Sequence, residues 1–109
     1  MSKGYTVAPW RPKPGLGQSL AVSSGSSSTF ANAVGADGQT RALALSLAPT
    51  ATATGCLVSI THTGAAATAT SDILLKTTDP PLIIGCAPGD KVSAYGLAAC
   101  TLYLSELTQ

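Results

Sequence analysis

His62 is the only histidine of the chain, so any acid–base chemistry by imidazole would depend on it alone. A serine hydrolase needs its histidine beside a carboxylate and beside a serine on a sharp strand-to-helix turn. The Gly-x-Ser-x-Gly pattern of such a turn is absent, and serine is so abundant that a serine near His62 indicates nothing. We therefore interpret His62 as a surface or interface side chain and predict that the protein is not an enzyme.

The acidic side chains stand mainly at expected turns. Asp37, Asp79 and Asp90 each adjoin a glycine or proline, where an aspartate hydrogen-bonds its own backbone. Calcium needs several oxygen ligands from one loop, whereas Asp72 and Asp79 flank an expected strand. The sequence therefore predicts neither a calcium site nor a catalytic pair of carboxylates.

Cysteine occurs three times, at positions 56, 86 and 100, with no Cys-x-x-Cys pair. This odd number and wide spacing are typical of neither a zinc site nor a disulfide framework. All three fall in or near expected strands, where a free cysteine packs as a small hydrophobe. We expect reduced, buried thiols, no metal and no cofactor, and folding in a reducing compartment.

Nucleic-acid, nucleotide and membrane binding have little support in the sequence. Residues 15–20 hold two glycines of a dinucleotide-binding fingerprint but lack the third, and they precede an expected strand where a helix is needed. The net charge is +1, too small for a nucleic-acid footprint. We find no apolar run of the ~18–20 residues that span a bilayer, and no secretory signal in the first ten residues.

Residues 1–17 are predicted to form an extended, basic N-terminal arm. Three prolines disfavour helix there, and the segment carries Tyr5, Trp10, Arg11 and Lys13 before the first acidic residue. Aromatic side chains are scarce in disordered tails because such tails bury nothing. We expect these four residues to contact a partner subunit; packing of Trp10 on its own domain and a plain solvated tail are the alternatives.

From residue 18 onward the apolar pattern has a period of two. Residues 41–48 alternate leucines with alanine and serine, and residues 101–107 set Leu102, Leu104 and Glu106 on one face. Other expected strand segments are 18–22, 30–34, 56–62, 65–70, 73–76, 82–86 and 91–95. Short strands at such regular spacing predict an all-β fold, with residues 18–109 forming one sandwich or jelly-roll-like domain of about eight strands.

The composition is poor in charge. Only 10% of residues are charged and 5% are aromatic, whereas ~25–35% charged residues usually cover the surface of a soluble monomer. Either a neutral, hydroxyl-rich skin faces solvent, or part of the surface lies against other subunits, where charged residues are depleted. The second interpretation predicts a homo-oligomer or an assembly with other proteins.

Several segments together resemble a known class of protein. They are TRALAL at residues 40–45, GCLVSI at 55–60, ATATSD at 67–72, PGDKVSAY at 88–95 and TLYLSEL at 101–107. Over residues 18–109 the chain is similar to the small β-sandwich decoration or cement proteins of tailed-bacteriophage virions. The resemblance implies a virion component made in the host bacterial cytoplasm and bound to the major capsid protein or other virion subunits on the capsid surface.

The expected function is therefore capsid decoration, in which many copies stabilise the phage head. A head-completion, collar or fibre-attachment protein is the alternative within the virion. A carbohydrate-binding β-sandwich for host adsorption is the alternative from another class, and it would use aromatic platforms for which Tyr95 and Tyr103 are the candidates outside the arm.

Overall fold

The computed structural model describes residues 11–70 and 73–108, and within these ranges it contains eight strands and no helix. The strands are β1 (Arg11–Val22), β2 (Ser27–Thr29), β3 (Ala42–Leu47), β4 (Gly55–Thr61), β5 (Ile73–Lys76), β6 (Leu82–Gly85), β7 (Lys91–Gly96) and β8 (Cys100–Thr108). The predicted all-β class is confirmed.

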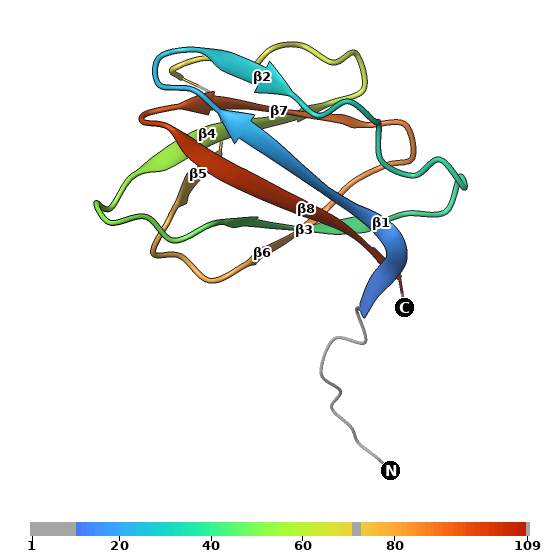
Figure 1. Ribbon diagram of the computed structural model, residues 1–109. Coiled ribbons are helices and arrows are strands. Elements are labelled where there is room, and N and C mark those ends of the chain that lie inside the picture. The colour runs from blue at the N-terminus through green and yellow to red at the C-terminus, as the bar shows by residue number, and fades with distance from the viewer. Residues whose placement is uncertain (1–10, 71–72, 109) are drawn as a thin grey trace.

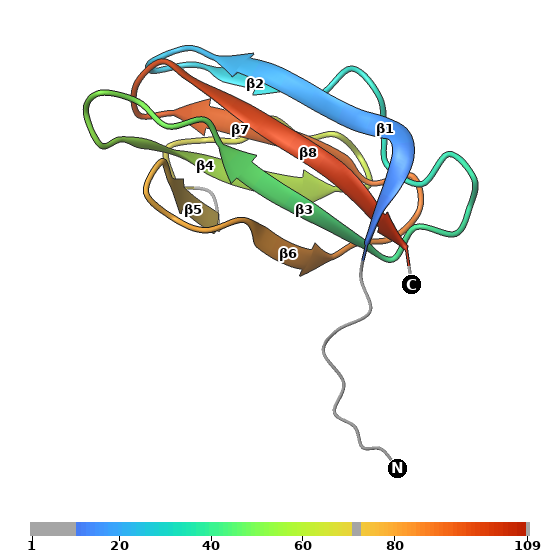
Figure 2. The same ribbon diagram turned by 60° about the horizontal axis from the view of Figure 1, so that its bottom comes forward.

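Two antiparallel sheets of four strands pack face to face (Figures 1 and 2). One sheet has the order β1-β8-β3-β6 and the other β2-β7-β4-β5. The architecture is thus a sandwich, in which each sheet buries its inner face against the other.

The strand pairing is nested. Ladders join β1 to β8, β2 to β7, β3 to β6 and β4 to β5, which are the pairs of one long hairpin with its tip between β4 and β5. Folding that hairpin over adds the ladders β3–β8 and β4–β7. Every connection except β4–β5 consequently crosses from one sheet to the other.

The core lies between the sheets and follows from the period-two pattern. Leu43 and Leu45 of β3 and Leu102 and Leu104 of β8 are almost completely buried, because alternate residues of a strand point to the same face. Burial of each such leucine contributes about 1.5–3 kcal/mol relative to exposure. The other sheet supplies smaller side chains opposite them, among them Cys56, Val58, Val92 and Ala94.

The expected strand at residues 30–34 is not formed. Its apolar residues Phe30 and Val34 are buried, and the N–H of Phe30 donates to Val92 O of β7 at 3.0 Å, whereas Val34 bonds the turn before β7 through Asp90 O at 2.8 Å and the Gly89 N–H at 2.7 Å. The residues between them bulge outward, and the short strand β2 forms instead in the preceding serine run. The sequence pattern therefore predicted correctly that Phe30 and Val34 are buried. Two buried residues four positions apart do not, however, require a continuous strand between them.

The alternating Ala-Thr segment 65–70 is also not a strand. It belongs to the β4–β5 connection, where the Ala67 N–H donates to Ser93 Oγ at 2.9 Å and Ala67 is buried. Because its side chains are small, this segment covers part of the outer face of the β2-β7-β4-β5 sheet rather than joining its edge.

The first sheet contacts are made by residues that the sequence assigned to the arm. Arg11 and Pro12 pair with Thr108 and Leu107, and after an irregularity the ladder resumes at Gly17. β1 is an edge strand, where prolines are tolerated because one side of the strand needs no donor. Residues 11–17 therefore lie in β1, whereas residues 1–10 of the predicted arm lie outside the described residues.

Candidate functional site

Of the four predicted arm contacts, Tyr5 and Trp10 lie outside the described residues, and Arg11 is exposed at the start of β1. Within its own chain, the ammonium of Lys13 forms two contacts. It donates to Asp37 Oδ2 at 2.7 Å and to Thr40 Oγ1 at 2.8 Å, and only 12% of its side chain is exposed. The Lys13 ammonium lowers the pKa of Asp37, with help from the Gln39 N–H.

The contact with Thr40 connects Lys13 to a buried carboxylate. The Thr40 hydroxyl donates to Glu106 Oε1 at 2.6 Å, and the Gly35 N–H donates to the same oxygen at 2.9 Å. Glu106 is only 3% exposed, because it continues the inward face of β8 after Leu104. The sequence pattern placed Glu106 on that face, but gave no sign of partners 66 and 71 residues away.

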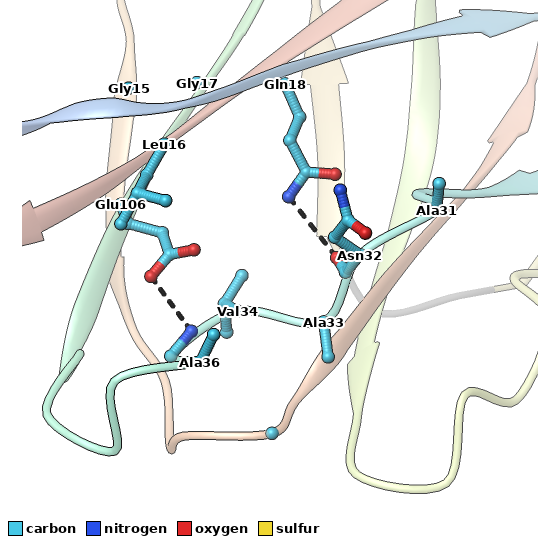
Figure 3. Close-up of a pocket in the computed structure, with 12 residues that line it drawn as sticks. Gly15, Leu16, Gly17, Gln18, Ala31, Asn32, Ala33, Val34, Ala36 and Glu106 are labelled. Atoms are coloured by element: carbon cyan, nitrogen blue, oxygen red, sulfur yellow. Dashed lines mark hydrogen bonds between the residues drawn. The ribbon is translucent and has the colours of Figure 1, made fainter.

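Glu106 lines a cavity of about 450 Å³ at one end of the sandwich (Figure 3). Backbone of the segments 15–18 and 31–36 forms most of its wall. Glu106 lies on one side, and Gln18 and Asn32 lie on the other, where Gln18 Nε2 donates to Asn32 O at 3.3 Å. The wall is otherwise built from small or apolar residues, so its polarity is concentrated in these three side chains and the backbone.

A second feature is the outer face of the β1-β8-β3-β6 sheet. Its outward positions, read from the strand register, are Pro12, Gly17, Ser19, Ala21, Ala42, Ala44, Ser46, Ile83, Gly85, Thr101, Tyr103, Ser105 and Leu107, of which Ala42 and Leu107 are buried. None of these residues carries a charge. Most are small, so Tyr103 and Ile83 project from a low surface, 47% and 53% exposed. A shallow hollow of about 290 Å³ lies beside Tyr103.

The outer face of the β2-β7-β4-β5 sheet is different. Lys76 and Lys91 lie on it near strand ends, and the segment around Ala67 covers part of it. Tyr95 belongs to this face, since it pairs with Leu57 on β4 and points away from the core residue Ala94. Tyr95 and Tyr103 therefore face opposite sides of the sandwich and cannot form one aromatic platform.

His62 lies at the end of the sandwich. Its Nδ1 is 3.5 Å from Asp90 Oδ1, and 77% of its side chain is exposed. An exposed pair of this kind contributes little to stability. Among residues 11–70 and 73–108, no three His, Cys, Asp or Glu side chains gather as metal ligands.

The cysteines Cys56 and Cys100 come from opposite sheets and meet in the core. Their thiols share a hydrogen bond, and burial together with the neighbouring thiol raises the pKa of Cys56 to about 12. Burial also raises the pKa values of Cys100 and of the half-buried Cys86. Cysteines with such pKa values are protonated near neutral pH, which suits packing and not nucleophilic chemistry.

In the part of the chain that the structure describes, no helix is both long and apolar enough to cross a membrane. Comparison of the chain with protein-family models, with curated proteins and with solved structures finds no match. The resemblance to phage decoration proteins therefore stays a prediction, and function has to be argued from the geometry of this chain.

Proposed function

We propose that this protein is a virion structural protein that attaches to a neighbouring protein surface through the outer face of its β1-β8-β3-β6 sheet. Its place is the outer capsid surface of a tailed bacteriophage, where many copies bind the major capsid protein and stabilise the head. The observation that carries the proposal is the uncharged outer face with its two projecting side chains, Tyr103 and Ile83.

Such a face has the composition of a protein-binding surface. Interface centres are depleted in charged residues and enriched in aromatic ones. Tyr103 supplies a rigid aromatic group, and the hollow beside it gives a partner side chain a place to enter. The small residues around Tyr103 and the hollow let a partner's surface approach closely over the rest of the face.

The nested strand pairing supports the same proposal. We interpret the eight strands, paired as a folded-over hairpin, as jelly-roll-like, an architecture common in viral capsid proteins and also in lectins. Because one fold serves several functions, the fold alone does not decide between them. The lectin alternative is weakened because Tyr95 and Tyr103 lie on opposite faces of the sandwich.

Weak attachment at each copy is sufficient for decoration. A repeating capsid lattice presents many equivalent sites, and an oligomer that engages several of them at once gains avidity without new contacts. A head-completion, collar or fibre-attachment protein would use the same face but would occupy few positions in each particle.

Copy number in purified virions tests this proposal. Quantitative mass spectrometry against the major capsid protein should find hundreds of copies of this chain per particle. About a dozen copies would move the protein to the neck or tail, and its absence from virions would overturn the proposal.

A further inference from the structure

We propose that the cavity beside Glu106 is a binding site for a primary ammonium group, such as a lysine side chain, which pairs with the carboxylate oxygen that the fold leaves free. This inference concerns the end of the sandwich rather than the uncharged outer face. It stands independently of the proposed virion role.

The first argument is charge. Asp37 and Glu106 are two carboxylates that share the single ammonium of Lys13, Asp37 directly and Glu106 through the Thr40 hydroxyl. Arg41, the other cation nearby, donates to the Thr40 carbonyl oxygen, and within the described residues it forms no ion pair with Glu106. The two carboxylates and Lys13 together therefore carry one more negative than positive charge, and among the described residues Arg41 lies nearby without a hydrogen bond to either carboxylate.

The second argument is the free acceptor. Both hydrogen bonds to Glu106 go to Oε1, and from the described residues Oε2 accepts none. In Figure 3 the oxygen without a hydrogen bond is turned into the cavity. Because no buried side-chain oxygen of the described residues lacks a partner, this second oxygen is accessible from the cavity, where a charged donor can bond it in place of water.

The geometry selects the chemical class of that donor. Divalent cations in proteins are usually held by more than one carboxylate, whereas Glu106 is the one carboxylate among the described residues that line this cavity. A guanidinium pairs best with two coplanar oxygens, and Oε1 is already occupied. An ammonium is a compact charge with three donors, so it can bond the single free oxygen Oε2 without a second carboxylate oxygen beside it.

The size also fits. The volume of about 450 Å³ lies in the range of sites for small ligands. Gly15 and Gly17 of β1 line the cavity and add no side chain to it, which leaves room for a flexible methylene chain.

Titration followed by ¹⁵N NMR tests the proposal on the full chain. The probes are Nα-acetyl-lysine amide, which represents a protein side chain, and putrescine, which represents a free amine; Nα-acetyl-norleucine amide is the neutral control. We expect saturable shifts of the Gly35 and Asn32 amide signals with one or both amines and none with norleucine amide. Binding of lysine amide alone would identify a protein side chain as the ligand, and binding of putrescine alone a free amine.

Glu106→Gln keeps an acceptor for Gly35 and Thr40 but removes the charge, and it should weaken binding at least tenfold. Asp79→Asn removes the same charge at an exposed turn and should leave affinity unchanged. Should Glu106→Gln fail to fold, Asp37→Asn replaces it: Lys13 is then free to compensate Glu106, so affinity should fall severalfold. The proposal is overturned if neither amine gives saturable shifts, if norleucine amide gives equal ones, or if the folded variant binds as tightly as the parent.

Discussion

At the scale of single residues, the polar side chains that matter are those that the fold buries. Glu106 lies on the apolar face of β8 and is stabilised by donors from the segment between β2 and β3. The sequence pattern predicted which way Glu106 faces, since it follows Leu102 and Leu104 at the same period. It could not predict the donors, because contacts between residues far apart in the chain depend on how the hairpin folds over.

The buried thiol of Cys56 makes stability depend on alkaline pH. In the unfolded chain this thiol loses its proton near its ordinary pKa of 9.0, whereas in the folded chain burial keeps it protonated to about pH 12. Its contribution to stability is therefore complete below pH 9 and is lost as pH rises from 9 towards 12. In urea denaturation, the wild-type midpoint should fall more steeply over this range than that of Cys56→Ala. Parallel curves for the two proteins would mean that the thiol is not buried as described.

At the scale of elements, the period-two pattern predicted the strands with alternating leucines and failed at β2, at residues 30–34 and at residues 65–70. The leucine alternation of β3 is confirmed, and so is the pattern of β8. β2 consists of Ser27, Ser28 and Thr29, so it has no apolar signal and is held by its ladder to β7. Residues 65–70 alternate alanine with threonine, but these side chains are too small to form the buried face of a strand. The segment instead lies over the outer face of the β2-β7-β4-β5 sheet.

The connection between β2 and β3 depends on Gly35. Its φ is 74°, a region that favours glycine, and an added Cβ would lie 2.6 Å from Pro88 Cα. Gly35→Ala should therefore destabilise the protein by well over ~1 kcal/mol, because the backbone must move and carry its hydrogen bond to Glu106 with it. Gly25→Ala is the matched control: φ is 71° and nothing lies within 4 Å, so only the conformational cost of about 1 kcal/mol remains. Equal losses in the two variants, measured by urea denaturation, would contradict the described approach to Pro88.

Because residues 11–17 belong to β1, deletion of residues 1–10 and deletion of residues 1–17 should have different effects on stability. Deleting residues 1–10 keeps all of β1 and its ladder to β8, so the melting temperature should fall less than on deletion of residues 1–17. Deleting residues 1–17 also removes Lys13 from Asp37 and Thr40, and the melting temperature should fall by several degrees. Capsid binding by the variant that lacks residues 1–10 tests the predicted anchoring role of Tyr5 and Trp10. If removal of residues 1–17 leaves stability unchanged, then residues 11–17 are an arm, as the sequence suggested.

At the scale of the whole molecule, the sandwich presents two unlike outer faces. One is uncharged and low apart from Tyr103 and Ile83, and the other carries lysines and a covering segment. The composition, with only 10% charged residues, predicted that some surface would be neutral. The composition does not say which face is neutral. The strand register does, because it places the outward residues of four strands side by side.

Placing one charge on each face in turn tests whether the protein attaches through its uncharged face. Cosedimentation with capsids that lack this protein, prepared from the phage that encodes it, would be measured for Tyr103→Glu and for Leu74→Glu on the opposite face. Both residues are about half exposed, so both variants should fold. The proposed attachment predicts that Tyr103→Glu weakens binding at least tenfold while Leu74→Glu binds like the parent protein. Unchanged binding by Tyr103→Glu would contradict it.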